Sequence, residues 1–181
     1  MEISKENLGP RIMIMGPMAS GKSTLAEMMG KKLGLPVYHL DQCCMLSNTR
    51  WKRCPIEESK ILHDQTVSTD KWIMEGNYLE FIHFRISRAT SIIWLNPSIL
   101  KCIFNFYKRF FRKNRRKNPY VGMLENAREK FTVIGLKYIF FHKKKKHLFE
   151  KALENFPRER IFYLNSSKMM KEFYRKIELL H

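Results

Sequence analysis

The chain has 181 residues, of which 44% are hydrophobic and 13% are aromatic. This composition excludes an intrinsically disordered protein and predicts one globular domain, residues 1–181, with a hydrophobic core. Lys and Arg number 34 against 17 Asp and Glu, so the formal net charge is +17. A positive field of this size attracts polyanions such as nucleotides, nucleic acids or an acidic membrane surface.

The N-terminal segment, the lengths of the apolar stretches and the cysteines limit the classes of protein further. The polar segment 1–10 does not resemble a signal peptide, and no stretch approaches the roughly 20 apolar residues of a membrane helix. The cysteines show no metal-binding spacing and are Cys43, Cys44, Cys54 and Cys102. We therefore expect reduced thiols, a cytoplasmic location and no membrane partner.

Short apolar runs alternate with segments of helical periodicity along the chain. In chain order, strands are predicted at 11–15, 37–40, 72–74, 91–95 and 160–164, and helices at 23–33, 56–68, 79–88, 99–112, much of 123–155, and from 166 or 167 to 180. This alternation predicts an α/β fold in which helices cover both faces of a parallel sheet.

A phosphate-binding sequence follows the first predicted strand. Residues 16–23 fit the pattern G-x-x-x-x-G-K-S/T. Its glycines let backbone N–H groups turn toward a polyphosphate, and the helix start adds its positive dipole end. We predict that the loop binds ATP, with Lys22 on the β- and γ-phosphates and Ser23 as a ligand of Mg²⁺. The predicted nucleotide-binding residues are Gly16, Pro17, Met18, Ala19, Ser20, Gly21, Lys22, Ser23 and Thr24.

Two carboxylates follow the next two predicted strands. Ligands of open parallel sheets bind at the carboxyl ends of the strands. Asp41 is predicted to bind the acceptor and to take the proton of its hydroxyl, and Glu75 to hold a magnesium-bound water. The alternatives are a turn or capping aspartate at Asp41 and a structural hydrogen bond at Glu75. His39 is interpreted as a packed strand histidine.

Basic residues dominate the middle of the chain, because residues 81–124 contain no Asp or Glu. Arg85 and Arg88 are three positions apart on a predicted helix, and such residues share a helix face. We predict that the pair clamps an anionic acceptor. The alternative is that both are solvated helix arginines.

Five segments together resemble a known family. They read RIMIMG at 11–16, GKSTLA at 21–26, HLDQ at 39–42, WIMEGNY at 72–78 and IIWL at 92–95. The combination is similar to the topology-modulation (FlaR-like) proteins, which are adenylate-kinase-related P-loop kinases. The resemblance implies a three-layer P-loop fold with a five-stranded parallel sheet in the order 2-3-1-4-5. It also implies a basic helical lid at about residues 105–130.

The resemblance also concerns the lid, the adenine-binding position and the magnesium site. Arg112 and Arg116 have helix-like spacing into the lid and are predicted to cover the transferring phosphate as catalytic residues. The alternative is that they belong to a solvated basic face. Related kinases place adenine at the position of residues 165–168. The chain departs from the family where relatives have Asp, Asp and Arg, at Glu75, Asn96 and Asn118.

The leading hypothesis is an ATP-dependent phosphotransferase of the nucleoside- or nucleotide-kinase type that acts on an unidentified small acceptor. One alternative is a nucleic-acid-associated protein whose NTP-bound state modulates DNA topology, which the net charge of +17 favours. Another is a P-loop scaffold that binds ATP without catalysis. The sequence leaves the acceptor and the oligomeric state open.

Overall fold

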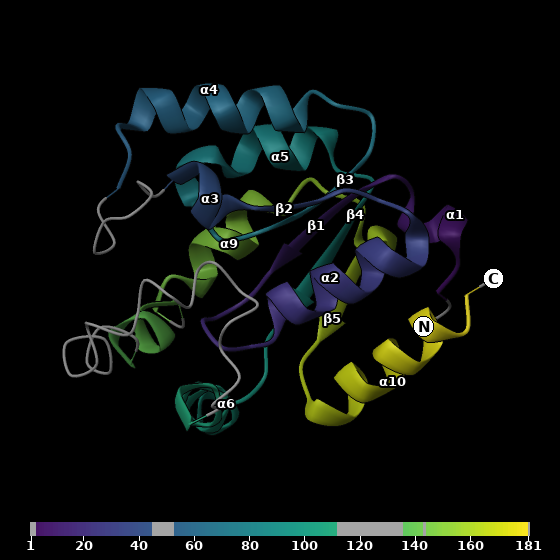
Figure 1. The fold of residues 1–181 in the computed structure, drawn as a ribbon, viewed down its shortest axis with the longest axis vertical. Helices are drawn as coiled ribbons and strands as arrows, with labels where there is room; N and C mark the ends of the chain where they lie inside the picture. The colour runs from purple at the N-terminus through teal and green to yellow at the C-terminus, as the bar shows by residue number, and fades with distance from the viewer. Residues whose placement is uncertain (1–2, 45–52, 112–135, 143, 181) are drawn as a thin grey trace.

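Five parallel strands form the centre of the molecule (Figure 1). The computed structural model describes residues 3–44, 53–111, 136–142 and 144–180. The strands are β1 (Arg11–Met15), β2 (Val37–His39), β3 (Trp72–Glu75), β4 (Ser91–Leu95) and β5 (Ile161–Leu164). They pair in the order β2-β3-β1-β4-β5, with every neighbouring pair parallel. This topology confirms the predicted fold.

Helices flank the sheet on both sides. They are α1 (Lys5–Leu8), α2 (Lys22–Leu33), α3 (Leu40–Cys44), α4 (Ile56–Val67), α5 (Ile82–Arg88), α6 (Ile99–Phe111), α9 (Lys146–Ala152) and α10 (Ser167–Glu178), with 3₁₀ turns η1 (Leu79–Phe81) and η2 (Arg158–Arg160). Residues 136–142 are also helical. Helices α2 and α10 pack together on one side, and α4 lies along α5 on the other (Figure 1). In the part of the chain that the structure describes, no helix has the length and apolar character required to cross a bilayer.

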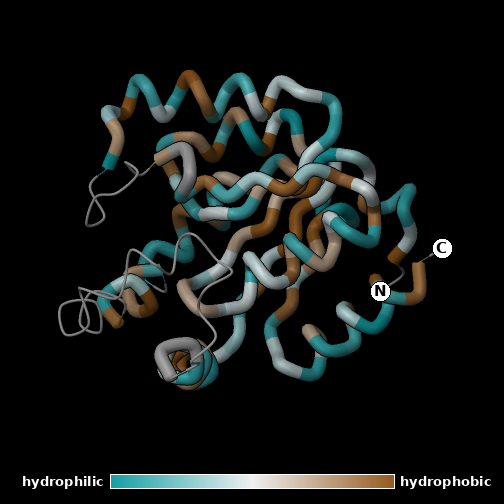
Figure 2. The backbone as a smooth tube through the Cα atoms, viewed as in Figure 1, coloured by the Kyte–Doolittle hydropathy of each residue, from teal (hydrophilic) through white to brown (hydrophobic). Residues whose placement is uncertain are grey.

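Both faces of the central strands are buried, which explains their continuous apolar sequences. Along β1, Ile12 and Ile14 join the core beneath α2 and α10, whereas Met13 and Met15 join the core on the opposite face. All four side chains are inaccessible to solvent. Strands covered on both faces lose the polar alternation of half-exposed strands. Figure 2 shows the same arrangement, with hydrophobic strands inside and hydrophilic stretches on the outer helices.

Local signals account for the helix ends near the nucleotide loop and at the C-terminus. Helix α2 ends at Gly34, whose φ of 66° is left-handed and whose N–H donates to the carbonyl of Gly30. Helix α10 begins after Ser166, whose hydroxyl accepts a hydrogen bond from the N–H of Met169 at 3.1 Å. The predicted C-terminal glycine and N-terminal serine are therefore confirmed.

The structure differs from the predicted elements in three places. Strand β2 ends at His39, so Asp41 lies in the first turn of α3 rather than after the strand. Leu40 turns inward at this point and is 1% exposed. The predicted helix 79–88 divides into η1 and α5. The short helix α1, capped by the hydroxyl of Ser4, was not predicted. Of the predicted helix 123–155, residues 123–135 lie outside the described residues.

Helix α2 packs so closely on β2 that Gly30 leaves no space for a side chain. A Cβ at this position would lie 2.3 Å from Cγ2 of Val37 and 3.1 Å from the carbonyl oxygen of Leu35. In an exposed helix, Gly→Ala stabilises by about 1 kcal/mol. Here we expect Gly30→Ala to destabilise the fold by about 1–3 kcal/mol, because the backbone or Val37 must move. Thermal unfolding would show this as a lower Tm.

The control for this experiment is Lys31→Ala on the exposed face of the same helix. It is expected to change the free energy of unfolding by less than about 0.5 kcal/mol. A higher Tm for Gly30→Ala would contradict the close contact between α2 and β2.

Candidate functional site

The segment between β1 and α2 turns sharply over the carboxyl edge of the sheet. Three of its residues have positive φ angles, 149° at Gly16, 60° at Ala19 and 101° at Gly21. A non-glycine residue in the left-handed region is uncommon. A Cβ on Gly16 would lie 2.3 Å from the carbonyl oxygen of Leu95, at the end of β4. The first glycine of the motif is therefore required by the close approach of β4.

The start of α2 presents its amide groups and a lysine to this loop. Within the described residues, no side chain caps the helix at Gly21. The first N–H groups of an uncapped helix are available to an anion. Nζ of Lys22 donates to the carbonyl of Pro17 at 3.0 Å, so the ammonium lies across the loop. The arrangement concentrates positive charge where the sequence predicts a triphosphate.

Asn77 fastens this loop to the end of β3. Its Oδ1 accepts from the N–H of Gly16 at 3.0 Å, and its Nδ2 donates to the carbonyl of the same residue at 2.6 Å. One side chain thus satisfies both backbone groups of Gly16, which are 61 positions away in the sequence. The loop is positioned by β3 and β4 as well as by its own strand.

A chain of polar side chains runs from α2 across the ends of β3 and β2. The hydroxyl of Ser23 donates to Oε1 of Glu75 at 3.0 Å. The same oxygen lies 2.8 Å from Nδ1 of His39, and Nε2 of His39 lies 2.9 Å from Glu27. Glu75 is buried, with 6% of its surface exposed. The two residues predicted to bind magnesium are therefore in direct contact.

Charge within this chain follows from the hydrogen bonds. The bond to Glu75 raises the pKa of His39 to about 9, although burial opposes the change, so the imidazole is cationic at neutral pH. Burial alone would raise the pKa of Glu75, but the bond to His39 and the charges of Lys22 and His39 lower it. Glu75 is thus a buried anion beside a serine hydroxyl. Mg²⁺ is commonly bound by one or two protein oxygens together with phosphates and water, and this pair fits that requirement.

Asp41 lies near the same edge and contacts Tyr78. The phenol of Tyr78 donates to Oδ1 of Asp41 at 2.7 Å. Burial is the main reason that the pKa of Asp41 is raised. The charges of Lys22 and His39 oppose that rise. The structure therefore brings Lys22, Ser23, Asp41 and Glu75 to one end of the sheet.

Arg85 and Arg88 are not brought together at this site. Arg85 is completely buried, and its guanidinium donates to the carbonyls of Gly76 at 2.8 Å and Tyr78 at 2.9 Å. Burial lowers its pKa to about 10. Arg88 donates to the carbonyl of Ser68, just before β3, at the opposite end of the sheet. This placement corrects the expectation of a shared arginine clamp: the helix face at Arg85 is packed against the loop after β3.

Helix α6 and residues 136–142 pack against the phosphate loop from outside the sheet. Cys102, Phe106 and Ile139 form a buried cluster with Met18 and Ala19 of the loop. Nδ2 of Asn105 donates to the carbonyl of Ala19 at 3.0 Å. The described start of the predicted lid is thus joined to the loop that it was expected to cover.

The arginines predicted for the lid, Arg112 and Arg116, lie outside the described residues. The loop after β5 is described, and Nδ2 of Asn96 donates to Oδ1 of Asn165 at 3.4 Å. Residues 165–168, where the resemblance places adenine, therefore follow β5 at the carboxyl edge of the sheet. Their role in binding adenine stays a prediction.

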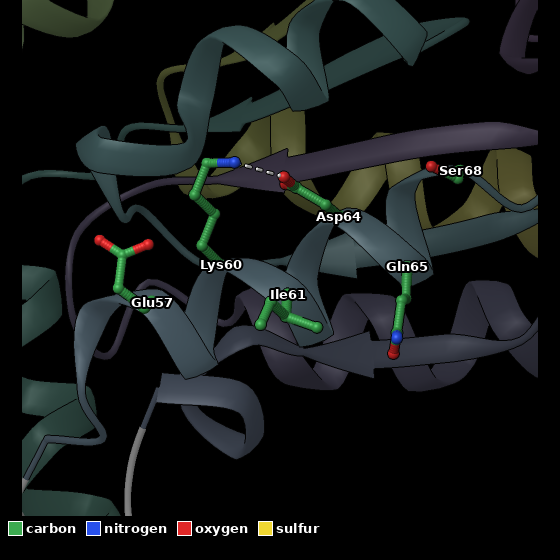
Figure 3. A pocket seen from close by; sticks show the side chains of 6 residues that line it. All are labelled: Glu57, Lys60, Ile61, Asp64, Gln65 and Ser68. Atoms are coloured by element: carbon green, nitrogen blue, oxygen red, sulfur yellow. Dashed lines mark hydrogen bonds and ion pairs between the residues drawn. The ribbon is translucent and has the colours of Figure 1, made fainter.

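A surface depression lies away from these residues, along α4 (Figure 3). It is lined by Glu57, Lys60, Ile61, Asp64, Gln65 and Ser68. All six come from one helix and the residue that follows it, and Lys60 is paired with Asp64 at 3.0 Å. The depression shares no residue with the phosphate loop, and we do not assign it to the candidate site.

Three residues of the site were not assigned roles from the sequence: His39, Asn77 and Tyr78. The G-N-Y element at 76–78 enters only through the resemblance. Its position directly after a strand could have indicated a site residue, because ligands bind at the carboxyl ends of parallel strands. The sequence favours a packing role for His39, because a strand histidine is more often packed than catalytic. Both carboxylates that it contacts, Glu27 and Glu75, come from other elements.

Comparisons with known proteins agree with the fold. No protein-family model matches the sequence, and no curated protein matches it significantly. Among solved structures, a shikimate kinase from Acinetobacter baumannii in complex with shikimate is similar at 15% identity and a TM-score of 0.57, over 96% of this chain and 93% of that one. A gluconokinase from Sinorhizobium meliloti is 13% identical with a TM-score of 0.54, over 94% and 90% of the two chains. A sugar kinase from a Janibacter species is 15% identical with a TM-score of 0.50, over 92% and 89%.

At these identities the likeness establishes the architecture. The chain has the P-loop fold, with a five-stranded parallel sheet in the same order as predicted. The finer resemblance to topology-modulation proteins stays a prediction.

The charge on His39 predicts a pH-dependent contribution to stability. Because folding raises the pKa of His39 from 6.5 to about 9, protonated His39 stabilises the fold. That contribution is complete below about pH 6.5 and is lost as the pH rises through about 9. We expect His39→Gln to lower the free energy of unfolding by about 2 kcal/mol near pH 6 and by much less near pH 10.

Urea unfolding at the two pH values measures this difference, with the exposed His83→Gln as the matched control. A destabilisation by His39→Gln that is equal at both pH values would show that the imidazole is not charged between the two glutamates.

Proposed function

We propose that the protein is an ATP-dependent phosphotransferase that transfers the γ-phosphate of ATP to a hydroxyl group of a small molecule, of the nucleoside- or nucleotide-kinase type. The observation that carries the proposal is the common location of two kinds of group. The phosphate loop with Lys22 and the carboxylate of Asp41 lie at the same end of the sheet. One holds a triphosphate, and the other can receive a proton from an acceptor.

Each described residue has a distinct part in this proposal. The amide groups at the start of α2 and the ammonium of Lys22 bind the phosphates and offset their negative charge. Ser23 and Glu75 would hold Mg²⁺, which would offset the negative charge of the phosphates. Asp41 orients the acceptor hydroxyl and takes its proton, and burial raises the pKa of Asp41, which makes its carboxylate a stronger proton acceptor. Arg112 and Arg116 are proposed to add positive charge over the transferred phosphoryl group.

The similar structures support the reaction class. They are named as kinases of shikimate, of gluconate and of a sugar. Hydroxylated metabolites of this kind are therefore the first acceptors to assay, together with nucleosides and nucleoside monophosphates. The nucleic-acid-associated alternative has no support from these similarities.

Lys22 provides the direct test of nucleotide binding. Removing its ammonium leaves the β- and γ-phosphates without a charge-assisted partner, so Lys22→Ala should weaken the affinity for ATP by about tenfold or more. Isothermal titration calorimetry with ATP and Mg²⁺ measures this. The control is Lys32→Ala, at the exposed far end of α2. Equal affinities of Lys22→Ala and the unmodified protein would overturn the proposal.

Asp41 provides the test of catalysis. Asp41→Asn keeps the size of the side chain but cannot take a proton, so the rate of phosphoryl transfer should fall by about 10²–10⁴-fold. The affinity for ATP should stay within about twofold of the unmodified value, because no hydrogen bond or ion pair joins Asp41 to the phosphate loop in the described part of the chain. A coupled assay of ADP release with shikimate, gluconate and a panel of nucleosides measures the rate, and the exposed Asp70→Asn is the control. Tight ATP binding with no turnover of any acceptor would instead favour a non-catalytic scaffold.

A further inference from the structure

The two carboxylate oxygens of Asp41 have different surroundings. Oδ1 accepts a hydrogen bond from the phenol of Tyr78 at 2.7 Å. Among the described residues, no hydrogen bond reaches Oδ2, and this atom is not one of the fully buried polar atoms that lack a partner. Within the described ranges, Oδ1 is thus the oxygen that has a partner, and Oδ2 is the one left for an incoming group.

The phenol that occupies Oδ1 stays protonated. Burial raises the pKa of Tyr78 far above its ordinary value, and the neighbouring charge of Asp41 raises it further. A protonated phenol beside a carboxylate donates its hydrogen. The guanidinium of Arg53 lies over the tyrosine ring, 5.5 Å from the ring centre, and is paired with Glu80 at 2.9 Å. The side chain of Tyr78 thus contacts a half-buried carboxylate through its hydroxyl and an exposed ion pair over its ring.

Tyr78 belongs to the segment 76–78, and each of these three residues takes part in a hydrogen bond to another part of the chain or in a side-chain bond to its backbone. The carbonyls of Gly76 and Tyr78 accept from the buried guanidinium of Arg85. Between them, the side-chain amide of Asn77 holds Gly16 of the phosphate loop. A Cβ at Gly76 would lie 2.8 Å from Cβ of Leu40, the residue before Asp41. The segment therefore contacts both the phosphate loop and the backbone beside Asp41.

We propose that Tyr78 is a positioning residue that holds Oδ1 of Asp41 and so assigns Oδ2 as the atom that receives the proton of the acceptor hydroxyl. The segment 76–78, held by Arg85, sets the position of that oxygen relative to the phosphate loop. This inference rests on the proposed phosphotransferase function. It adds which oxygen reacts and which residue decides it.

The step that follows from this geometry balances in atoms and charge. The O–H bond of the acceptor breaks, and its proton goes to Oδ2 of Asp41. The acceptor oxygen forms a bond to the γ-phosphorus of ATP, the bond from that phosphorus to the β,γ-bridging oxygen breaks, and ADP leaves with that electron pair. Tyr78 neither gains nor loses a proton, because its hydrogen stays between the phenol and Oδ1.

The test is Tyr78→Phe, which removes one oxygen atom and keeps the ring. The donor to Oδ1 stabilises the carboxylate form, so its loss should move the titration of Asp41 to higher pH. NMR of protein labelled with ¹³C at the aspartate carboxyl carbons measures this directly, because the chain has only Asp41, Asp64 and Asp70. The charged groups that act on Asp41, namely Lys22, His39 and Glu75, are unchanged in the variant.

Kinetics give a second readout. With the most active acceptor of the panel, Tyr78→Phe should lower kcat about tenfold and leave KM for ATP within about twofold. In the double variant Asp41→Asn with Tyr78→Phe, the second change should lower kcat no further, since Tyr78 acts through Asp41. A purely structural role would give additive losses. The matched control is Tyr163→Phe, which removes the same hydroxyl from an exposed tyrosine on β5.

The outcomes separate this inference from the proposed function. An unchanged titration of Asp41 in Tyr78→Phe overturns the inference whether or not the protein is a kinase. Additive losses in the double variant overturn it as well. If the unmodified protein neither binds ATP nor turns over any acceptor, the proposed function fails, and with it the assignment of Oδ2 as a proton acceptor. A shifted titration with non-additive kinetics supports both.

Discussion

The arrangement of the candidate site depends on the pair of hydrogen bonds between Asn77 and Gly16. The backbone of Gly16 has a φ of 149° and lies against the carbonyl of Leu95, so it cannot use regular strand pairing for both of its polar groups. A buried backbone group without a partner is expensive in free energy. One amide side chain satisfies both groups and thereby joins the end of β3 to the phosphate loop.

The same segment connects the loop to the two carboxylates. Glu75, the last residue of β3, accepts from Ser23, whereas Tyr78, three residues later, donates to Asp41. Residues 75–78 therefore contact a predicted magnesium ligand, the phosphate loop and the predicted proton acceptor in turn. Buried charge is tolerated here because each group has a partner. Glu75 is paired with cationic His39, and Arg85 donates to two carbonyls.

Much of the fold could be predicted, because a parallel sheet buried on both faces requires uninterrupted apolar strands. Residues 11–15 and 91–95 have this pattern, and the structure has strands with the same bounds. The phosphate loop was equally readable, since its glycines and lysine act locally. Arg85 illustrates the limit. A spacing of three residues predicts a common helix face, but it does not show whether that face meets solvent or the loop after β3.

The sequence by itself determined the alternation of strands and helices, the phosphate loop and the end of α2 at Gly34. These features depend on residues that are neighbours in the chain, through periodicity, backbone freedom and capping. Only the tertiary structure decided that His39 is a cation between two glutamates, that Asn77 holds Gly16, and that Tyr78 occupies one oxygen of Asp41. Each of those contacts joins elements between 12 and 61 residues apart. Their chemistry follows from how the strands are ordered in the sheet, which no local pattern specifies.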